Sequence, residues 1–351
     1  QRDQPPFAAS AMDGYAVAGT VKPGDRLRVI GQSAAGHRFS KTVAPGEAVR
    51  IFTGAPLPKS ADRVILQEDA EVEGDHIILR DRLDASPFVR PAAGDFGKGA
   101  ELAPCWLGPA EISLAAAMGH ARLRVGRHPD VAIITTGDEL CVPGGTPRDD
   151  QIFSSNAYGL HALLSSAGAR VRLLPIAADT EEALISAFRF AKGADLIVSI
   201  GGASVGDHDL IRRVTRKLGL EESFYRVAVR PGKPLIAGRL GSASFVALPG
   251  NPVSALVCGQ VFLIPMMRAL QGDTSPEPTP KEAALTHGLG PNGPRTHYMR
   301  ARLENGKLTI AEHQDSSLLS VLRDANALAI RTPNDGQREE GECLPFVLLT
   351  T

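Results

Sequence analysis

Cysteine is scarce in this 351-residue sequence. There are four, none of them in a Cys-x-x-Cys pair: Cys105, Cys141, Cys258 and Cys343. Scattered single cysteines suit a reducing compartment and argue against a disulfide framework or a structural zinc site. An excess of one charge is also lacking, because 38 Lys and Arg face 39 Asp and Glu, a net charge of −1. A nearly neutral protein has no overall positive electrostatic field that would attract nucleic acid or an acidic membrane, so any anion site must be local.

Long hydrophobic runs are absent as well. The best candidate, residues 253–270, is interrupted by Gly259, Gln260 and Pro265, so we expect no membrane span. No secretory signal opens the chain, which begins at Gln1, and we expect part of its first domain to precede that residue. The cytoplasm is the expected location.

The composition is that of a globular protein with two or three domains, with 43% apolar and 22% charged residues. Up to residue 126, short apolar runs separated by Gly and Pro predict β-strands, followed by a short helix over 110–118. The expected strands lie at 27–30, 48–52, 64–66 and 76–79.

From residue 129 the pattern changes to strands alternating with helices, which predicts a parallel, doubly wound sheet. Ser155 is expected to cap the first of these helices and Gly168 to end it. A Pro-rich linker over 271–281 leads to a small β domain with strands near 298–303, 307–311, 327–331 and 342–349. The expected α/β elements are strands at 131–135, 171–174, 196–200 and 245–248 and helices at 156–167, 180–192, 209–218 and 253–270.

Four consecutive strands of the α/β region end in small, polar or acidic residues. These ends are 136–139, Asp179, 201–209 and 249–252. Ligands of open α/β sheets bind beyond the carboxyl ends of the strands, so together these loops predict a polar ligand pocket. Within the third loop, Gly201, Gly202 and Gly206 allow the backbone N–H groups to approach an anion. The alternative is a simple strand-to-helix turn capped by an aspartate.

Carboxylates at these strand ends suggest a Mg²⁺ site, since magnesium takes one or two carboxylates and keeps several waters. Each could instead be a helix cap or a surface charge. His208 has no second His at a ligand spacing, so a metal role for it is not favoured. The candidate metal ligands are Glu139, Asp179, Asp207 and Asp209.

Two cations, Arg230 and Lys233, occupy a Pro/Gly turn, Arg230-Pro231-Gly232-Lys233-Pro234. Proline restricts the backbone, so such a turn can hold cationic side chains as an oxyanion clamp. The alternative is a solvated hairpin tip. Pro252 then occupies the first position of the longest helix, which is also ordinary helix initiation.

Taken together, these segments resemble the molybdopterin molybdenumtransferases, the MoeA-type and gephyrin E-domain family. The motifs occur in order along nearly the whole chain. They are Pro5-Pro6-Phe7, Ser10-Ala11-Met12-Asp13-Gly14-Tyr15-Ala16-Val17, Arg50-Ile51-Phe52-Thr53-Gly54-Ala55-Pro56, Thr136-Gly137-Asp138-Glu139-Leu140, the 201–209 loop, the 230–234 turn and Leu248-Pro249-Gly250-Asn251-Pro252-Val253-Ser254-Ala255.

The resemblance implies a homodimer of four-domain subunits. By position we assign a linking domain to 1–10 and 98–126, an inserted β domain to 11–97, an α/β molybdopterin-binding domain to 127–272 and a C-terminal β-barrel to 273–351. The implied catalytic residues are Asp13, Thr53, Asp95, Glu139, Asp179 and Asp209. The implied substrate-binding residues are Gly201, Gly202, Ser204, Gly206, Arg230, Lys233, Pro249, Asn251, Pro252, Ser254, Arg300 and Ser316.

Four residues depart from the family pattern. Ala8-Ala9 stands where Asp-Asn is common, so a carboxylate is absent there. Arg230 replaces the usual Lys, which keeps the charge and changes its geometry. Ala203 replaces a more usual Val.

The reaction that the resemblance implies is Mg²⁺-dependent: adenylyl-molybdopterin and molybdate give molybdenum cofactor and AMP. Other proteins of cofactor biosynthesis or molybdoenzyme maturation are candidate partners, whereas nucleic acid and membranes are not expected. Because Asp13 and Thr53 belong to one domain and the strand-end carboxylates to another, we expect an active site shared between two subunits.

Two rival functions stay open at this point. An adenylyltransferase or nucleotide pyrophosphatase would use the α/β domain alone, without the 10–17 and 53–56 motifs or the barrel. A gephyrin-like scaffold would need an added linker or receptor groove, for which the sequence gives no sign.

Overall fold

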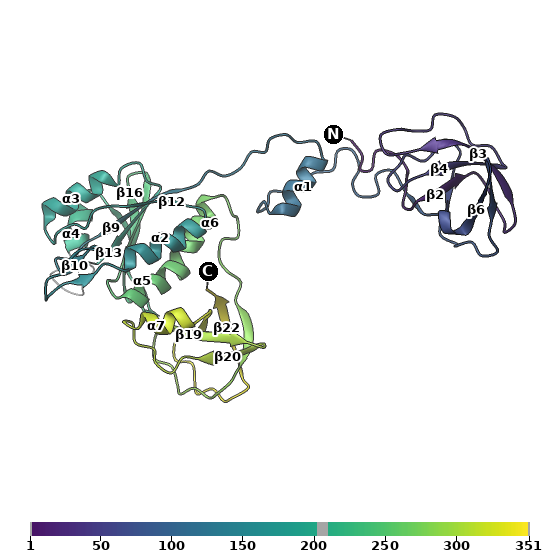
Figure 1. Ribbon diagram of the computed structural model, residues 1–351. Helices are drawn as coiled ribbons and strands as arrows, with labels where there is room; N and C mark the ends of the chain where they lie inside the picture. Colours follow the sequence, from purple (N-terminus) through teal and green to yellow (C-terminus); the bar gives the residue numbers. More distant parts are fainter. Residues whose placement is uncertain (1, 202–209, 350–351) are drawn as a thin grey trace. The chain divides into compact units, whose positions relative to one another are not determined.

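The structure is a computed structural model that describes residues 2–201 and 210–349. The chain divides into two compact units, Gln1–Arg124 and Val125–Thr351, which Figure 1 shows with their helices and strands. The first unit is mostly β-structure and ends in one helix. The second contains an α/β sheet followed by a barrel.

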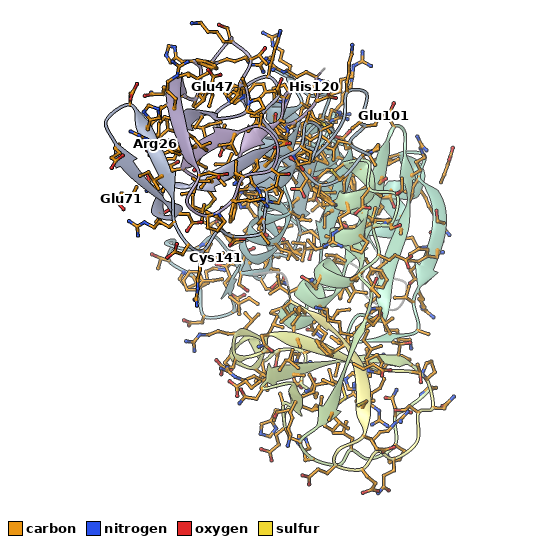
Figure 2. The ribbon with its side chains drawn as sticks, turned by 90° about the vertical axis from the view of Figure 1, so that its right-hand side faces the viewer. Arg26, Glu47, Glu71, Glu101, His120 and Cys141 are labelled. Carbon is orange, nitrogen blue, oxygen red and sulfur yellow. The ribbon has the colours of Figure 1, made fainter. Side chains whose placement is uncertain are left out.

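A six-stranded sheet forms the core of the first unit, in the order β5-β2-β4-β3-β7-β6. Its strand β2, next to the edge strand β5, is wholly buried, with Tyr15 and Val17 packed on one side and Ala16 on the other. Arg26, Glu47 and Glu71 lie on its strands (Figure 2). The strands of this unit are β1 (Ala9–Ser10), β2 (Gly14–Val17), β3 (Arg26–Ser33), β4 (Glu47–Ile51), β5 (Arg63–Leu66), β6 (Ala70–Glu73), β7 (His76–Leu79) and β8 (Val89–Arg90), with a 3-10 turn at Gln67–Asp69.

Helix α1 (Pro109–Ala117) follows this sheet near the end of the unit. Pro109 starts it, the Glu111 carboxylate accepts the N–H of Gly108, and Gly119 at φ +90° ends it. The four strands expected in this region and the short helix are all present. The domain boundaries assigned within the unit stay predictions.

The sheet of the second unit has the order β12-β9-β13-β17-β16-β14. The first four strands are parallel, but β16 runs antiparallel to both of its neighbours, β17 and β14, so β14 has the direction of the first four strands. The expectation of a parallel sheet is therefore wrong at this edge, because the two-residue turn at Gly241 makes β16 and β17 a hairpin. A separate pair of short parallel strands consists of β10 (Leu140–Cys141), with Cys141 labelled in Figure 2, and β11 (Ile152–Phe153). The strands of the six-stranded sheet are β9 (Asp130–Thr135), β12 (Arg170–Leu173), β13 (Leu196–Ile200), β14 (Glu221–Arg226), β16 (Pro234–Leu240) and β17 (Ala243–Leu248).

Helices cover both faces of this sheet, so the doubly wound arrangement is confirmed. The buried side chains of α3 (Glu181–Phe190) and α4 (Leu210–Lys217) pack on one face, and those of α2 (Asn156–Ser166), α5 (Pro252–Cys258) and α6 (Ile264–Leu270) on the other. Gly168 ends α2 at φ +87° as expected. Ser155 occupies the N-cap position as expected, but its hydroxyl donates to the Asn156 side chain and does not cap a backbone N–H.

A π-helical segment, Gly259–Leu263, joins α5 to α6, so Pro252–Leu270 is one continuous helix. It is long and apolar enough to cross a membrane. However, Ala255, Cys258, Leu263 and Met267 pack against the sheet in the core. This packing is that of a core helix in a globular domain.

A five-stranded barrel completes the second unit in the order β19-β20-β18-β22-β21, and β21 pairs back with β19 to close it. The expected C-terminal β-barrel is therefore confirmed. The short strand β15 (Val229–Arg230), which belongs to the connection between β14 and β16, pairs parallel with β19. The barrel elements are β18 (Lys281–Leu285), β19 (Thr296–Glu304), β20 (Lys307–Ile310), α7 (Leu319–Asp324), β21 (Ala327–Arg331) and β22 (Cys343–Leu348).

Candidate functional site

The carboxyl ends of β9 and β12 bring an acidic pair together. The Thr136 hydroxyl donates to Asp179 Oδ1 at 2.5 Å, and the Asp179 N–H donates to Asp138 Oδ1 at 3.1 Å. Thr136 is 2% exposed, whereas Asp138 and Asp179 are exposed. A buried hydroxyl thus orients a carboxylate at the surface. Asp138 was not among the predicted site residues, although it lies in the Thr-Gly-Asp-Glu motif.

Two glycines allow these strand ends to lie close to one another. Gly201, at φ +88°, follows β13, and a Cβ there would lie 2.5 Å from the Thr136 carbonyl oxygen. Gly137 accommodates the Glu139 carboxylate, which would lie 2.6 Å from a Cβ at that position. Glu139 therefore folds back over its own loop, and no contact joins it to Asp179 among the described residues.

Most of the predicted glycine loop lies outside the described residues. This applies to Gly202, Ser204, Gly206, Asp207 and Asp209. Among residues 2–201 and 210–349, no three His, Cys, Asp or Glu side chains gather in a way that could hold a metal ion. The described carboxylates therefore offer a pair, Asp138 and Asp179, and not a complete protein cage.

The end of β17 joins the α/β sheet to the barrel. Asn251, the residue before α5, donates through its side-chain amide to the Ser316 hydroxyl at 3.1 Å, and the Val253 N–H donates to the Ser316 carbonyl at 3.0 Å. The Asn156 side chain reaches the Gly250 carbonyl at 2.6 Å. The predicted residues Asn251 and Ser316 are thus direct neighbours, although 65 positions separate them. Pro249 and Ser254 are buried on either side of Asn251, and Pro252 starts the helix.

Arg300 on β19 is fully buried and incompletely paired. One amino group donates to the carbonyls of His313 and Asp315, at 3.3 and 2.9 Å. Its Nε and the other amino nitrogen have no partner among the described residues. Burial lowers the pKa of this guanidinium, and the neighbouring Arg230 lowers the pKa further. Buried unsatisfied donors are costly, so this guanidinium is suited to receive an anion.

Arg230 and Lys233 lie in the connection that joins β14 to β16. Both side chains are exposed and neither has a carboxylate partner among the described residues, while Pro231 and Gly232 are buried. A Cβ at Gly232 would lie 2.2 Å from Cys258 Sγ. This turn is therefore anchored against α5 and the barrel, and it is not the free hairpin tip of the alternative interpretation.

His297 is a buried residue that no sequence motif singles out. It is 6% exposed, and its Nε2 has no partner among the described residues. Burial lowers its pKa to about 4, helped by Arg230, Arg300, Arg331 and Arg295. The imidazole is thus neutral within a cationic region. The burial of His297 among these arginines becomes evident only from the pairing of strands that are distant in the sequence.

In the first unit, Asp13 and Thr53 form a second polar site. Asp13 Oδ1 accepts the Thr53 N–H at 2.7 Å and the Thr53 hydroxyl at 2.8 Å. These bonds lower the pKa of Asp13, and the nearby Arg50 lowers it further. Arg50 itself lies over the rings of Tyr15 and Phe52. Two of the residues that the resemblance implies are catalytic are therefore in direct contact, and their catalytic role stays a prediction.

Asp95 differs from these two residues. Its backbone N–H donates to the Gln4 carbonyl at 2.9 Å, and its carboxylate is exposed without a hydrogen bond or ion pair in the described part of the chain. The structure does not bring it to Asp13 or Thr53 through any described contact. Its catalytic assignment stays a prediction.

Three family profiles match successive parts of the chain. The MoeA N-terminal region (domain I and II) matches residues 1–119, a probable molybdopterin binding domain matches 132–269, and the MoeA C-terminal region (domain IV) matches 282–349.

Whole-chain relatives agree with these profiles. The molybdopterin molybdenumtransferase of Haemophilus influenzae is 33% identical over 96% of this chain and 86% of its own length. Molybdopterin molybdenumtransferase 2 of Mycobacterium tuberculosis is 34% identical over 92% of this chain and 84% of its own. The crystal structure of a molybdopterin biosynthesis MoeA protein from Pyrococcus horikoshii aligns with a TM-score of 0.78 and 30% identity over 100% of this chain and 89% of that one.

Proposed function

Because the chain belongs to the molybdopterin molybdenumtransferase family, we propose that it is a transferase of molybdenum cofactor biosynthesis. It delivers molybdate to adenylyl-molybdopterin and yields molybdenum cofactor and AMP. A lone adenylyltransferase or nucleotide pyrophosphatase is not favoured, because the profile matches also cover the N-terminal unit and the barrel.

The observation that supports this proposal most directly is the unfilled cationic site around Arg300. Two of its buried guanidinium nitrogens lack a partner among the described residues, and the exposed cation Arg230 lies close enough to lower its pKa. Ser316, held by Asn251, follows the Asp315 carbonyl that Arg300 binds. A tetrahedral dianion such as molybdate would receive charge-assisted hydrogen bonds here, with Lys233 as a further cation.

Magnesium is the second part of the proposal. Asp179 and Asp138 each retain a carboxylate oxygen without a described hydrogen bond, and they share one edge of the sheet. Such a pair fits an ion that takes one or two carboxylates and completes its shell with water and phosphate oxygens. When bound, Mg²⁺ would neutralise charge on the phosphate bridge that breaks. Glu139, Asp207 and Asp209 are further candidate ligands.

A homodimer is the third part. Around α1 the large apolar side chains Leu107, Ile112 and Leu123 are 36%, 53% and 40% exposed. Several exposed large apolar side chains in one short segment suggest a protein interface, and two-fold dimers are the commonest oligomers. Sedimentation velocity tests this part: we expect a dimer for the native chain and a monomer for Ile112→Glu. A monomeric native chain would refute it.

The decisive experiment incubates the purified protein with adenylyl-molybdopterin and Mg²⁺, with and without molybdate. We expect AMP and active cofactor to form together, and only when molybdate is present. Equal AMP release without molybdate would identify a nucleotide pyrophosphatase instead.

The magnesium proposal has a separate test. We expect EDTA to abolish AMP release, and Asp179→Asn to raise the required Mg²⁺ concentration about tenfold or more. Asp149→Asn, which removes an exposed carboxylate from the connection between β10 and β11, serves as the matched control and keeps the native requirement. Full turnover in EDTA would rule out the metal.

A further inference from the structure

A pocket of about 270 Å³ lies between the long helix and the barrel. On the helix side it is lined by Gln260, Ile264 and Arg268, which follow one another at intervals of four residues and so share one side of the helix. On the barrel side, Lys281 of β18 lies directly opposite Phe346 of β22. Residues of the Pro-rich linker close the remaining wall.

The pocket contains two cations without counter-charges. Neither Arg268 nor Lys281 forms an ion pair or a side-chain hydrogen bond within residues 2–201 and 210–349. Arg268 is half-buried, so its charge is partly removed from water. Two unpaired like charges at one concave site favour an anionic occupant.

The rest of the lining is apolar or neutral. Ile264 and Phe346 are buried, Leu348 adds a further apolar surface, and the Gln260 amide donates weakly to the Leu348 carbonyl at 3.4 Å. Gln260 also lies in the π-helical segment, and such segments are frequent at functional sites. The volume lies just below the usual range for ligand pockets, roughly 300–1,000 Å³. It suits one ring or a short apolar chain.

From these features we propose that the pocket binds a small amphiphilic anion, an apolar group that bears one carboxylate or phosphate. Arg268 and Lys281 bind the anionic oxygens, and Ile264 and Phe346 contact the apolar part.

This pocket is separate from the proposed molybdate site. Asn251 and Ser316 meet at the start of the helix, whereas Gln260 and Arg268 lie about 12 and 24 Å further along its axis, at 1.5 Å per residue. The inference therefore goes beyond the proposed function and does not depend on it.

Isothermal titration with phenyl phosphate and benzoate tests the proposal, using the full chain saturated with molybdate so that its other anion site is filled. Phenol and inorganic phosphate, which lack the charge and the apolar group respectively, are the comparison ligands. We expect both amphiphilic anions to bind and both comparison ligands to bind at least about tenfold more weakly. Equal binding of phenol, or no binding by either amphiphilic anion, would overturn the assignment.

Variants of the two pocket cations test whether the amphiphilic anion binds in this pocket. Arg268→Gln combined with Lys281→Gln should weaken phenyl phosphate binding about tenfold or more, whereas the charge-conserving pair Arg268→Lys and Lys281→Arg should largely retain it. The matched control, Lys192→Gln with Arg239→Gln, removes two exposed cations from elsewhere in the same unit. Should the double variant fold poorly, Lys281→Gln alone, at an exposed position, must still weaken binding. Native affinity in the pocket variants would place the ligand elsewhere.

Discussion

Arg230 lies directly opposite His297, where the short strand β15 pairs parallel with β19 of the barrel. On the other side of His297, in the same register, lies Arg331 of β21. A buried imidazole thus lies in a row with two guanidinium-bearing residues, and its pKa is lowered to about 4, first by burial and then by these cations. It is neutral near pH 7.

The first prediction concerns acid stability. An unfolded histidine binds a proton below about pH 6.5, while folded His297 does so only near pH 4. The unfolded state therefore binds more protons in this window, and the free energy of unfolding falls as pH drops from 6.5 to 4, by up to about 3 kcal/mol from this group. In His297→Gln this contribution should vanish. Urea unfolding of both proteins at pH 7, 5.5 and 4.5 measures the difference; parallel pH curves would contradict it.

The second prediction concerns the proposed anion clamp. Arg230→Gln or Lys233→Gln should raise the molybdate concentration for half-maximal AMP release about tenfold, the loss of one charge-assisted contact. Binding of adenylyl-molybdopterin should change less. Arg239→Gln, an exposed cation on β16, is the control. If molybdate dependence is unchanged in both clamp variants, the oxyanion binds elsewhere.

The third prediction concerns Asp13. Two hydrogen bonds from Thr53 hold its pKa below the usual value. Thr53→Val removes the hydroxyl donor and keeps the backbone one, so the pKa of Asp13 should rise and the acid limb of the activity profile should move to higher pH. Thr53→Ser, which retains the hydroxyl, should leave the limb in place. An unchanged profile in Thr53→Val would mean that Asp13 does not need to be ionised.

The fourth prediction compares two glycines in the left-handed region. Gly201 and Gly219 have nearly equal φ values, +88° and +89°. An alanine at either position costs about 1–2 kcal/mol of backbone strain. At Gly201 the new Cβ would also lie 2.5 Å from the Thr136 carbonyl oxygen, whereas at Gly219 no atom lies within 4 Å. Gly201→Ala should therefore cost about 1–3 kcal/mol more in urea unfolding. Equal losses would show that the strand ends can separate without cost.

Local sequence determined the elements of this fold to a large extent. The alternation of apolar runs with helical segments gave the doubly wound core, and Pro252 and Gly168 stand where one helix begins and another ends. These signals act over a few residues, through backbone geometry and periodicity, so they can be recognised from the sequence before the fold is known. The motifs around Asp13 and Thr53 were likewise recognisable in the sequence, and in the structure two hydrogen bonds join these two residues.

The tertiary structure decided what depends on partners far away in the chain. The contact of Asn251 with Ser316 and the unfilled donors of Arg300 both arise from pairings across many residues. The same is true of His297, whose neutral imidazole follows from its burial beside cations on other strands. Burial, hydrogen-bond satisfaction and electrostatic environment are properties of the packed molecule, because each depends on which groups replace water around a side chain.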